Sequence, residues 1–211
     1  MSFFFMKKDI LLDDLNRVDK FMKSFLYEET ADAAFPLLNH LLLTSGKQLR
    51  PRLTLLSFYM VNPSPSEELK EKLIQLAAAV EIIHCASLIH DDVIDEAETR
   101  RGQPTIRNKW GNSASVAVGV SLYARALQLV SNIGSLDILT ILTSAVRQMC
   151  DGELIQLTNR QQVIYKQADY MKVITSKTAA LFKAACETGV VLAKGTQYQQ
   201  DSLSAYATNL G

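Results

Sequence analysis

The feature that most constrains this 211-residue chain is one long apolar segment, residues 73–89. Gln75, Glu81 and His84 interrupt it and two aspartates follow it, so it is shorter and less uniform than a bilayer-spanning helix. A helix that is apolar on every side has to be surrounded by other helices. The segment therefore predicts the buried central helix of a helical bundle, and no transmembrane segment.

The rest of the chain also shows helical spacing of apolar residues, and only 9 Gly and 5 Pro interrupt it. We predict helices over residues 9–29, 35–44, 51–61, 65–95, 113–131, 135–162, 168–193 and 198–211. Ser64 is expected to cap the central helix, with Pro65 at its first position and Glu67 completing a capping box. No stretch alternates as a strand does, and residues 96–112 are expected to form a loop. The prediction is an all-α chain in which residues 1–211 form a single helical bundle and one domain.

Composition restricts the partners of the chain. Lys plus Arg number 22 and Asp plus Glu number 22, so no overall basic field attracts nucleic acid, and any charged partner has to be bound by a local cluster. The apolar run at the N-terminus is too short for a secretory signal, and its lysines follow it. Each of the three cysteines lies in an apolar or helical stretch and is expected to be a free thiol: Cys85, Cys150 and Cys186. We therefore expect a cytoplasmic protein with no nucleic-acid partner.

Three aspartates, Asp91, Asp92 and Asp95, end the central helix. Residues four apart share a helix face, so Asp91 and Asp95 project together, and their charges also oppose the helix dipole. An isolated pattern of this kind is more often a solvated helix end. At the end of the most buried helix it favours a bound cation, and carboxylates suit Mg²⁺, which takes one or two of them together with substrate phosphate oxygens.

Cationic side chains lie on both sides of this helix in the sequence. Arg100 and Arg101 follow within a short loop, and paired guanidinium groups suit bidentate phosphate recognition. Lys47 and Arg50 lie at a helix start, where backbone N–H groups also favour an anion, although the glycine spacing of a P-loop is absent. His84 lies two helical turns before the first aspartate and shares its face. Each feature alone is also typical of a surface or a helix cap; together they indicate a phosphate site.

The ordered motifs GK..RP, H-x6-DD-x2-D, RRGQPT and KTA resemble those of the trans-type polyprenyl diphosphate synthases over about residues 9–211. The resemblance implies a helical bundle of the isoprenoid synthase type and a prenyltransferase. Such an enzyme condenses isopentenyl diphosphate with an allylic diphosphate, such as farnesyl diphosphate. Magnesium assists ionisation of the allylic diphosphate, the double bond of isopentenyl diphosphate attacks, and a proton is lost.

Site residues follow from the same motifs. Asp91 and Asp95 would bind Mg²⁺, with Asp92 assisting. The allylic diphosphate would be held by Arg100, Lys177 and Thr178. Isopentenyl diphosphate would be held by Lys47, Arg50, His84 and Arg101. His90, which points elsewhere on the helix, is expected to be structural.

The resemblance also bears on the product. The growing chain would run down a tunnel beside Ala86 and Ser87, whose small side chains leave it open. The aspartate motif lacks a two-residue insertion that is typical of bacterial farnesyl synthases. We therefore expect a long-chain product, such as the octaprenyl diphosphate of a quinone side chain. A homodimer is also implied, with peripheral membrane contact as a route for product release.

Three departures from the family pattern leave alternatives open. The chain ends before the second aspartate-rich motif, so the bundle is expected to lack its C-terminal helices. Val120 stands where Asp is usual, and Gln48 where Arg or Lys is common. A non-catalytic or truncated partner subunit of a heteromeric prenyl synthase is the alternative, although the first aspartate motif and the arginine pair are intact. A terpene cyclase fits less well, because it binds only one diphosphate.

Overall fold

The computed structural model of the chain describes residues 2–28, 34–43, 46–159 and 166–211. The helices are α1 (Ser2–Tyr27), α2 (Phe35–Leu43), α3 (Leu49–Val61), α4 (Glu67–Ile94), α5 (Ile106–Ile133), α6 (Leu136–Asn159), α7 (Gln167–Ile174), α8 (Ala180–Leu192) and α9 (Gln197–Leu210). A π-helical turn, η2 (Thr175–Ala179), joins α7 to α8. The predicted helix ends at residues 29, 44 and 162 lie outside the described residues.

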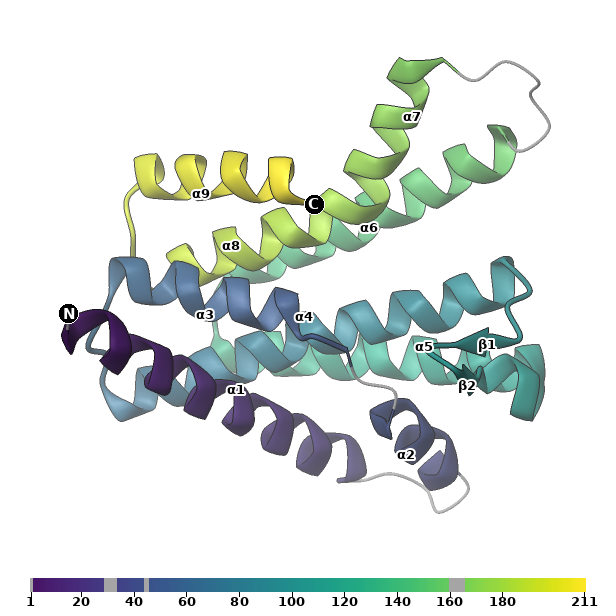
Figure 1. The fold of residues 1–211 in the computed structure, drawn as a ribbon, viewed down its shortest axis with the longest axis horizontal. Coiled ribbons are helices and arrows are strands. Elements are labelled where there is room, and N and C mark those ends of the chain that lie inside the picture. The colour runs from purple at the N-terminus through teal and green to yellow at the C-terminus, as the bar shows by residue number, and fades with distance from the viewer. Residues whose placement is uncertain (1, 29–33, 44–45, 160–165) are drawn as a thin grey trace.

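Helix α4 is the centre of the bundle, as its sequence predicts. Apart from Gln75, every side chain from Leu73 to Ile83 is buried. Helices α1, α3, α5 and α8 all pack against it, and in Figure 1 the pair α8–α9 lies on the opposite side of α3 and α4 from α1 and α2. The all-α bundle around a buried central helix is therefore confirmed.

Two helices, α4 and α5, are long and apolar enough to cross a membrane by length and composition alone. The most apolar stretch of α4 is 67% buried inside the bundle, and that of α5 is 39% buried. Burial of α4 against other helices explains its hydropathy, because a core helix is as apolar as a membrane span.

The cap of α4 differs from the prediction. Ser66 is the N-cap, its hydroxyl accepts a hydrogen bond from the Leu69 amide, and the helix begins at Glu67. Ser64 instead donates its amide to the side chain of Asn62 in the preceding turn. The assignment of Ser64 as cap is therefore wrong by two residues, because both serines fit the pattern and only the turn geometry selects between them.

The predicted strandless loop over residues 96–112 is also wrong. Strands β1 (Thr99–Arg100) and β2 (Gln103–Pro104) form an antiparallel hairpin, and both turn residues have positive φ angles, 53° for Arg101 and 75° for Gly102. The turn is of the kind that joins two strands through two residues. Helix α5 then begins at Ile106, and Gly111, with a φ of 85°, breaks its helical geometry. Two-residue strands are too short to show an alternating pattern.

The helix predicted over residues 168–193 is three elements. Helix α7 ends at Ile174, the turn η2 follows, and α8 begins at Ala180. No Gly or Pro lies at or near the junction of α7, η2 and α8, so the apolar spacing did not reveal the change of helical pitch. Figure 1 shows the consequence: α7 leaves the layer of α8 and α9 and extends alongside the far end of α6.

Candidate functional site

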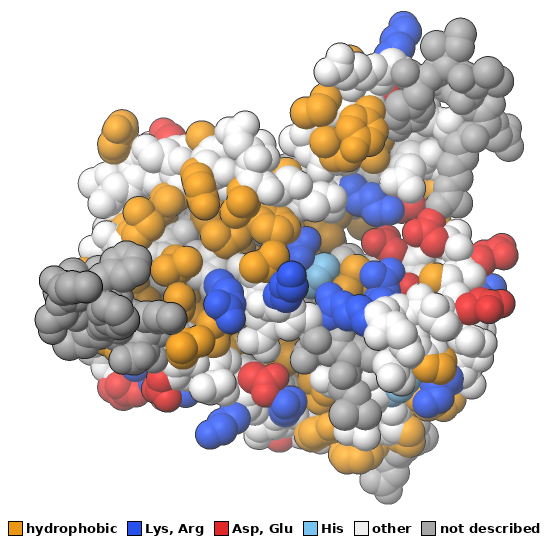
Figure 2. Space-filling model, in the orientation of Figure 1, with side chains coloured by type: hydrophobic (Ala, Val, Ile, Leu, Met, Phe, Trp, Pro, Cys, Tyr) orange, Lys and Arg blue, Asp and Glu red, His pale blue; other side chains and the backbone are white. Residues whose placement is uncertain are grey.

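Two cavities flank the C-terminal half of α4. The first, which we call the arginine cavity, encloses about 450 Å³ and is lined by Gly46, Lys47, Gln48, Leu49, Arg50, Glu81, His84 and Arg101. The second, the aspartate cavity, encloses about 260 Å³ and is lined by Ser87, His90, Asp91, Ile94, Tyr123, Met149, Cys150, Glu153, Leu154, Leu157 and Lys177. Figure 2 shows Lys and Arg side chains gathered beside a group of acidic ones on this face.

In the aspartate cavity, Lys177 joins α4 to α6. Its Nζ lies 3.9 Å from Asp91 Oδ1, forms an ion pair with Glu153 and is 3.4 Å from the Oε1 of Gln156. Burial raises the pKa of Asp91; Lys177 opposes this shift, while Glu153 and Asp95 add to it. The partly buried carboxylate is thus held where a cation would stabilise its charge.

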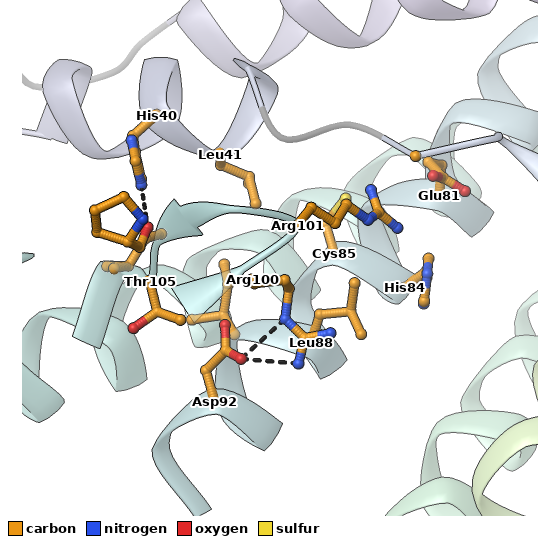
Figure 3. A pocket seen from close by; sticks show the side chains of 14 residues that line it. His40, Leu41, Glu81, His84, Cys85, Leu88, Asp92, Arg100, Arg101 and Thr105 are labelled. Atoms are coloured by element: carbon orange, nitrogen blue, oxygen red, sulfur yellow. Dashed lines mark hydrogen bonds and ion pairs between the residues drawn. The ribbon is translucent and has the colours of Figure 1, made fainter. Parts of the chain in front are cut away.

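Arg100 is bound to the second aspartate of the motif. Its Nε and Nη2 lie 2.9 Å and 2.8 Å from Asp92 Oδ1 (Figure 3). Asp92 is 6% exposed and does not line the aspartate cavity. Asp92 and Arg100 line a smaller cavity that shares Glu81, His84 and Arg101 with the arginine cavity, and the Asp92 carboxylate orients the Arg100 guanidinium group there.

The acidic residues fit a magnesium ion that is completed by substrate. Asp91 and the exposed Asp95 interact electrostatically one helical turn apart. Within the described residues, no three Asp, Glu, His or Cys side chains are close enough together to hold a metal ion. Mg²⁺ keeps water and binds through one or two carboxylates plus substrate phosphates, so a pair of aspartates meets its needs.

In the arginine cavity, two guanidinium groups converge from different elements. Arg50 of α3 stacks over the ring of Phe182, 4.5 Å from its centroid, and burial lowers its pKa while Glu81 opposes that shift. Arg101 comes from the hairpin turn and packs on Gly46, where a Cβ atom would lie 2.4 Å from its Nη2. Gly46 therefore leaves the room that the Arg101 guanidinium occupies.

His84 is held neutral at this site. Burial lowers the pKa of its imidazole to about 3, and the charges of Arg50, Arg101 and Arg100 add to the effect. A neutral ring can donate only one hydrogen bond. At the edge of the same cavity, the N-cap of α3, Gln48, makes no side-chain capping bond, so the first amides of α3 are open to an anion.

Of four further residues that the sequence singled out, only Ser87 lines either cavity. Ser87 lines the aspartate cavity and donates its hydroxyl to the His84 carbonyl at 2.8 Å. Ala86 is fully buried in the core and lines neither cavity. Thr178 lies half-buried in η2 beside Lys177 but also lines neither cavity. Val120 is 57% exposed on α5, away from both.

His90, expected to be structural, lines the aspartate cavity. Its ring occupies the space left by Gly119, where a Cβ would lie 2.1 Å from Nε2. It also packs against Tyr123 with ring centroids 5.8 Å apart. His90 is therefore both a packing residue and part of the cavity wall.

Sequence reasoning missed three polar residues of the site. Glu153 and Gln156 reach Lys177 from α6, and Glu81 lies in the arginine cavity. The clue to Glu81 was a charged residue inside the most apolar helix. In the sequence, Glu153 follows Gly152, a glycine within a helical stretch. The structure gives the reason for this glycine, because a Cβ there would lie 2.9 Å from the Lys177 backbone nitrogen.

The site can therefore bind two anions on either side of α4. One cavity is lined by the carboxylates of Asp91 and Glu153, with Lys177 beside them. The other is lined by Arg50 and Arg101, and Glu81 is the one acid among its described lining residues. Ile94, Met149 and Leu157 give the first cavity apolar walls that suit a hydrocarbon.

Known proteins share this fold and part of its sequence. An octaprenyl diphosphate synthase of Haemophilus influenzae is 42% identical over 166 residues, which cover 79% of this chain and 49% of that protein. A decaprenyl diphosphate synthase structure from Rhodobacter capsulatus superimposes with a TM-score of 0.89 at 37% identity, over 96% of this chain and 61% of that one. A polyprenyl synthase of Caulobacter crescentus, solved with calcium and isoprenyl diphosphate, gives 0.88 at 35% identity, over 96% and 60%.

The chain spans about half the length of the curated relatives it matches. The model of the polyprenyl synthetase family matches residues 34–211, which include both cavities and every element that lines them. The chain belongs to the polyprenyl synthetase family.

Proposed function

We propose that the chain is a Mg²⁺-dependent prenyltransferase that condenses isopentenyl diphosphate with an allylic diphosphate, such as farnesyl diphosphate. The observation that carries the proposal is the pair of cavities on either side of α4, one lined by Asp91, Glu153 and Lys177 and the other by Arg50 and Arg101. An enzyme with two diphosphate substrates needs two anion sites that lie close together. Relatives named octaprenyl and decaprenyl diphosphate synthase support this reading.

The aspartate cavity would bind the allylic diphosphate. Asp91 and Asp95 hold the ion, and bound Mg²⁺ supplies Lewis-acid stabilisation of the leaving diphosphate. Lys177, which lines this cavity, would bind the diphosphate oxygens. The sequence motif assigns Arg100 to the same diphosphate, and Asp92 fixes the direction of its guanidinium group. The apolar walls of the cavity exclude water from the allylic carbon as its C–O bond breaks.

The arginine cavity would bind isopentenyl diphosphate. Arg50, Arg101 and Lys47 neutralise its diphosphate, and the neutral His84 ring donates one further hydrogen bond. The double bond then attacks the allylic carbon, a carbon–carbon bond forms, and a proton lost to the departing diphosphate restores a trans double bond.

The product, the assembly and the location belong to the same proposal. The small side chain of Ser87 beside the aspartate cavity supports a long-chain all-trans product such as octaprenyl diphosphate, released with peripheral membrane contact.

Val116, Val120 and Leu127 are exposed on α5 and support a homodimer through that helix. Free cysteines support a cytoplasmic location. Lys177 pairs with Glu153 near Asp91, and Arg100 pairs with Asp92. These pairings favour a catalytic chain over a partner subunit without activity.

Substitution of Asp91 tests the proposal. Asp91→Asn keeps the shape of the side chain but removes the charge that would hold the ion, so we expect prenyl transfer to fall by about 100-fold or more. Asp13→Asn, an exposed aspartate on α1, is the control and should keep full activity. Wild-type turnover in folded Asp91→Asn would refute the assignment.

A further inference from the structure

Glu81 is a buried acid inside a cavity that otherwise suits an anion. It lies on α4, is 4% exposed and lines the arginine cavity. Its Oε2 atom is buried and makes no hydrogen bond to any described residue. An ionised carboxylate at this place would repel a diphosphate. Packing alone does not explain why an acid lies in this cavity.

The charged neighbours of Glu81 come from two other elements. Arg50 of α3 and Arg101 of the hairpin turn both stabilise its charge, yet burial still raises its pKa. In Figure 3 the guanidinium group of Arg101 extends toward Glu81 and away from Asp92. Glu81 in turn stabilises the charge of the largely buried Arg50. The carboxylate is the counter-charge of both guanidinium groups.

The other titratable groups around Glu81 do not compensate its charge. On α4 itself, His84 is neutral because its pKa is lowered to about 3, and burial raises the pKa of Cys85 so that the thiol stays protonated. Lys47, from the segment before α3, lines the same cavity but is exposed to solvent. Stabilisation of the carboxylate therefore depends on the two arginines.

A diphosphate in this cavity would compete for the same two arginines. Its oxygens accept hydrogen bonds from guanidinium groups, and it brings at least two negative charges close to Glu81. A buried carboxylate that loses its cations and faces an anion neutralises by taking a proton. The proton comes from solvent, one for each diphosphate bound, and no covalent bond changes.

We infer that Glu81 is a positioning residue that is the counter-charge of Arg50 and Arg101 in the arginine cavity and takes up a proton when a diphosphate binds there. The inference rests on the proposed function in one respect, that the anion is a diphosphate. It adds a role for a residue that does not itself bind the substrate.

Calorimetry of inorganic pyrophosphate binding to the whole chain tests the inference. The titration is run without metal or allylic substrate, at one pH, in buffers that differ in ionisation enthalpy, and the slope gives the protons taken up. We expect Glu81→Gln to take up fewer protons than the wild type, by more than half a proton per pyrophosphate bound. Glu68→Gln, at the exposed start of the same helix, is the matched control and should match the wild type. Protonation of pyrophosphate itself is common to all three proteins and cancels in the comparison.

An infrared difference spectrum of the wild type, with and without pyrophosphate, gives a readout that needs no variant. A protonated carboxylic acid band should appear on binding. Equal proton uptake by wild type and Glu81→Gln, or no such band, would overturn the inference. Proton uptake that is lost in His84→Gln but retained in Glu81→Gln would also overturn it, because the imidazole would then be the acceptor.

The two proposals fail in different ways. Pyrophosphate binding with proton uptake, but no prenyl transfer, would contradict the proposed function and leave the role of Glu81 intact. Prenyl transfer with equal proton uptake in both proteins would contradict the role of Glu81 alone. No pyrophosphate binding at all would remove the arginine cavity as an anion site and overturn the inference.

Discussion

Gly152→Ala should displace the lysine of the aspartate cavity without touching a charged group. Gly152 lies on α6 where the π-helical turn η2 crosses it, next to Glu153. A Cβ atom there would lie 2.9 Å from the backbone nitrogen of Lys177 and 2.9 Å from the Cβ of Ser176. Carbon contacts are normally about 3.5 Å or longer, so α6 and η2 would have to separate by about 0.6 Å. Much of the contact is with backbone, which a rotamer change cannot relieve.

The expected effect on stability is small. Overpacking of this kind costs about 1–3 kcal/mol, and the higher helix propensity of Ala offsets about 1 kcal/mol of that. The effect on activity is larger, because Lys177 Nζ already lies 3.9 Å from Asp91 and would move farther away. A displacement of about 1 Å at a catalytic group costs on the order of 100-fold, so we expect kcat/KM to fall by about 10- to 100-fold.

Steady-state kinetics with each diphosphate varied separately measures this effect. The KM for the allylic diphosphate should rise and that for isopentenyl diphosphate should not, since only the aspartate cavity contains Lys177. Asp151→Ala, the exposed neighbour on the same helix, is the control and adds no atom at the contact. Wild-type kcat/KM in folded Gly152→Ala would refute the claim that this glycine sets the position of Lys177.

Four further variants test other parts of the site. Asp92→Asn should weaken the hold on Arg100 and lower the free energy of unfolding by about 1–3 kcal/mol in urea denaturation; an unchanged midpoint would contradict this. Folded His84 stays neutral down to a pKa of about 3, whereas the unfolded ring takes a proton below about 6.5, so its contribution to stability falls as pH drops through that window. His84→Gln should therefore flatten the rise of unfolding free energy between about pH 4 and 6.5, and an equal slope in both proteins would count against burial of the ring. Ser87→Phe should shorten the product, measured by chromatography of the prenyl chains, because Ser87 lines the aspartate cavity; Ala86→Phe should mainly destabilise the fully buried core, and long products from Ser87→Phe would place the chain elsewhere.

Hydropathy was enough to predict the bundle and its centre. The run from Leu73 to Ile83 could only be stabilised inside other helices, and the structure buries it there. Local geometry was less predictable. Ser64 and Ser66 both fit a cap, and the hairpin at Arg101–Gly102 has strands of two residues, below the length at which alternation can be seen.

The motifs indicated which charged residues meet, but not how they pair. Spacing placed Asp91 and Asp95 on one face, and the structure keeps them in electrostatic contact. Nothing in the spacing showed that Arg100 would bind Asp92, or that a π-helical turn would carry Lys177. Those pairings depend on contacts between elements far apart in the chain, which periodicity does not encode.

Prenyl transfer at the aspartate and arginine cavities can be tested directly. The most direct measurement incubates the 211-residue chain with farnesyl diphosphate, labelled isopentenyl diphosphate and Mg²⁺, and sizes the lipid products. We predict a ladder of labelled prenyl chains ending in a long polyprenyl product, which disappears when the metal is chelated. A folded chain that binds both diphosphates and yet forms no labelled lipid would contradict the account.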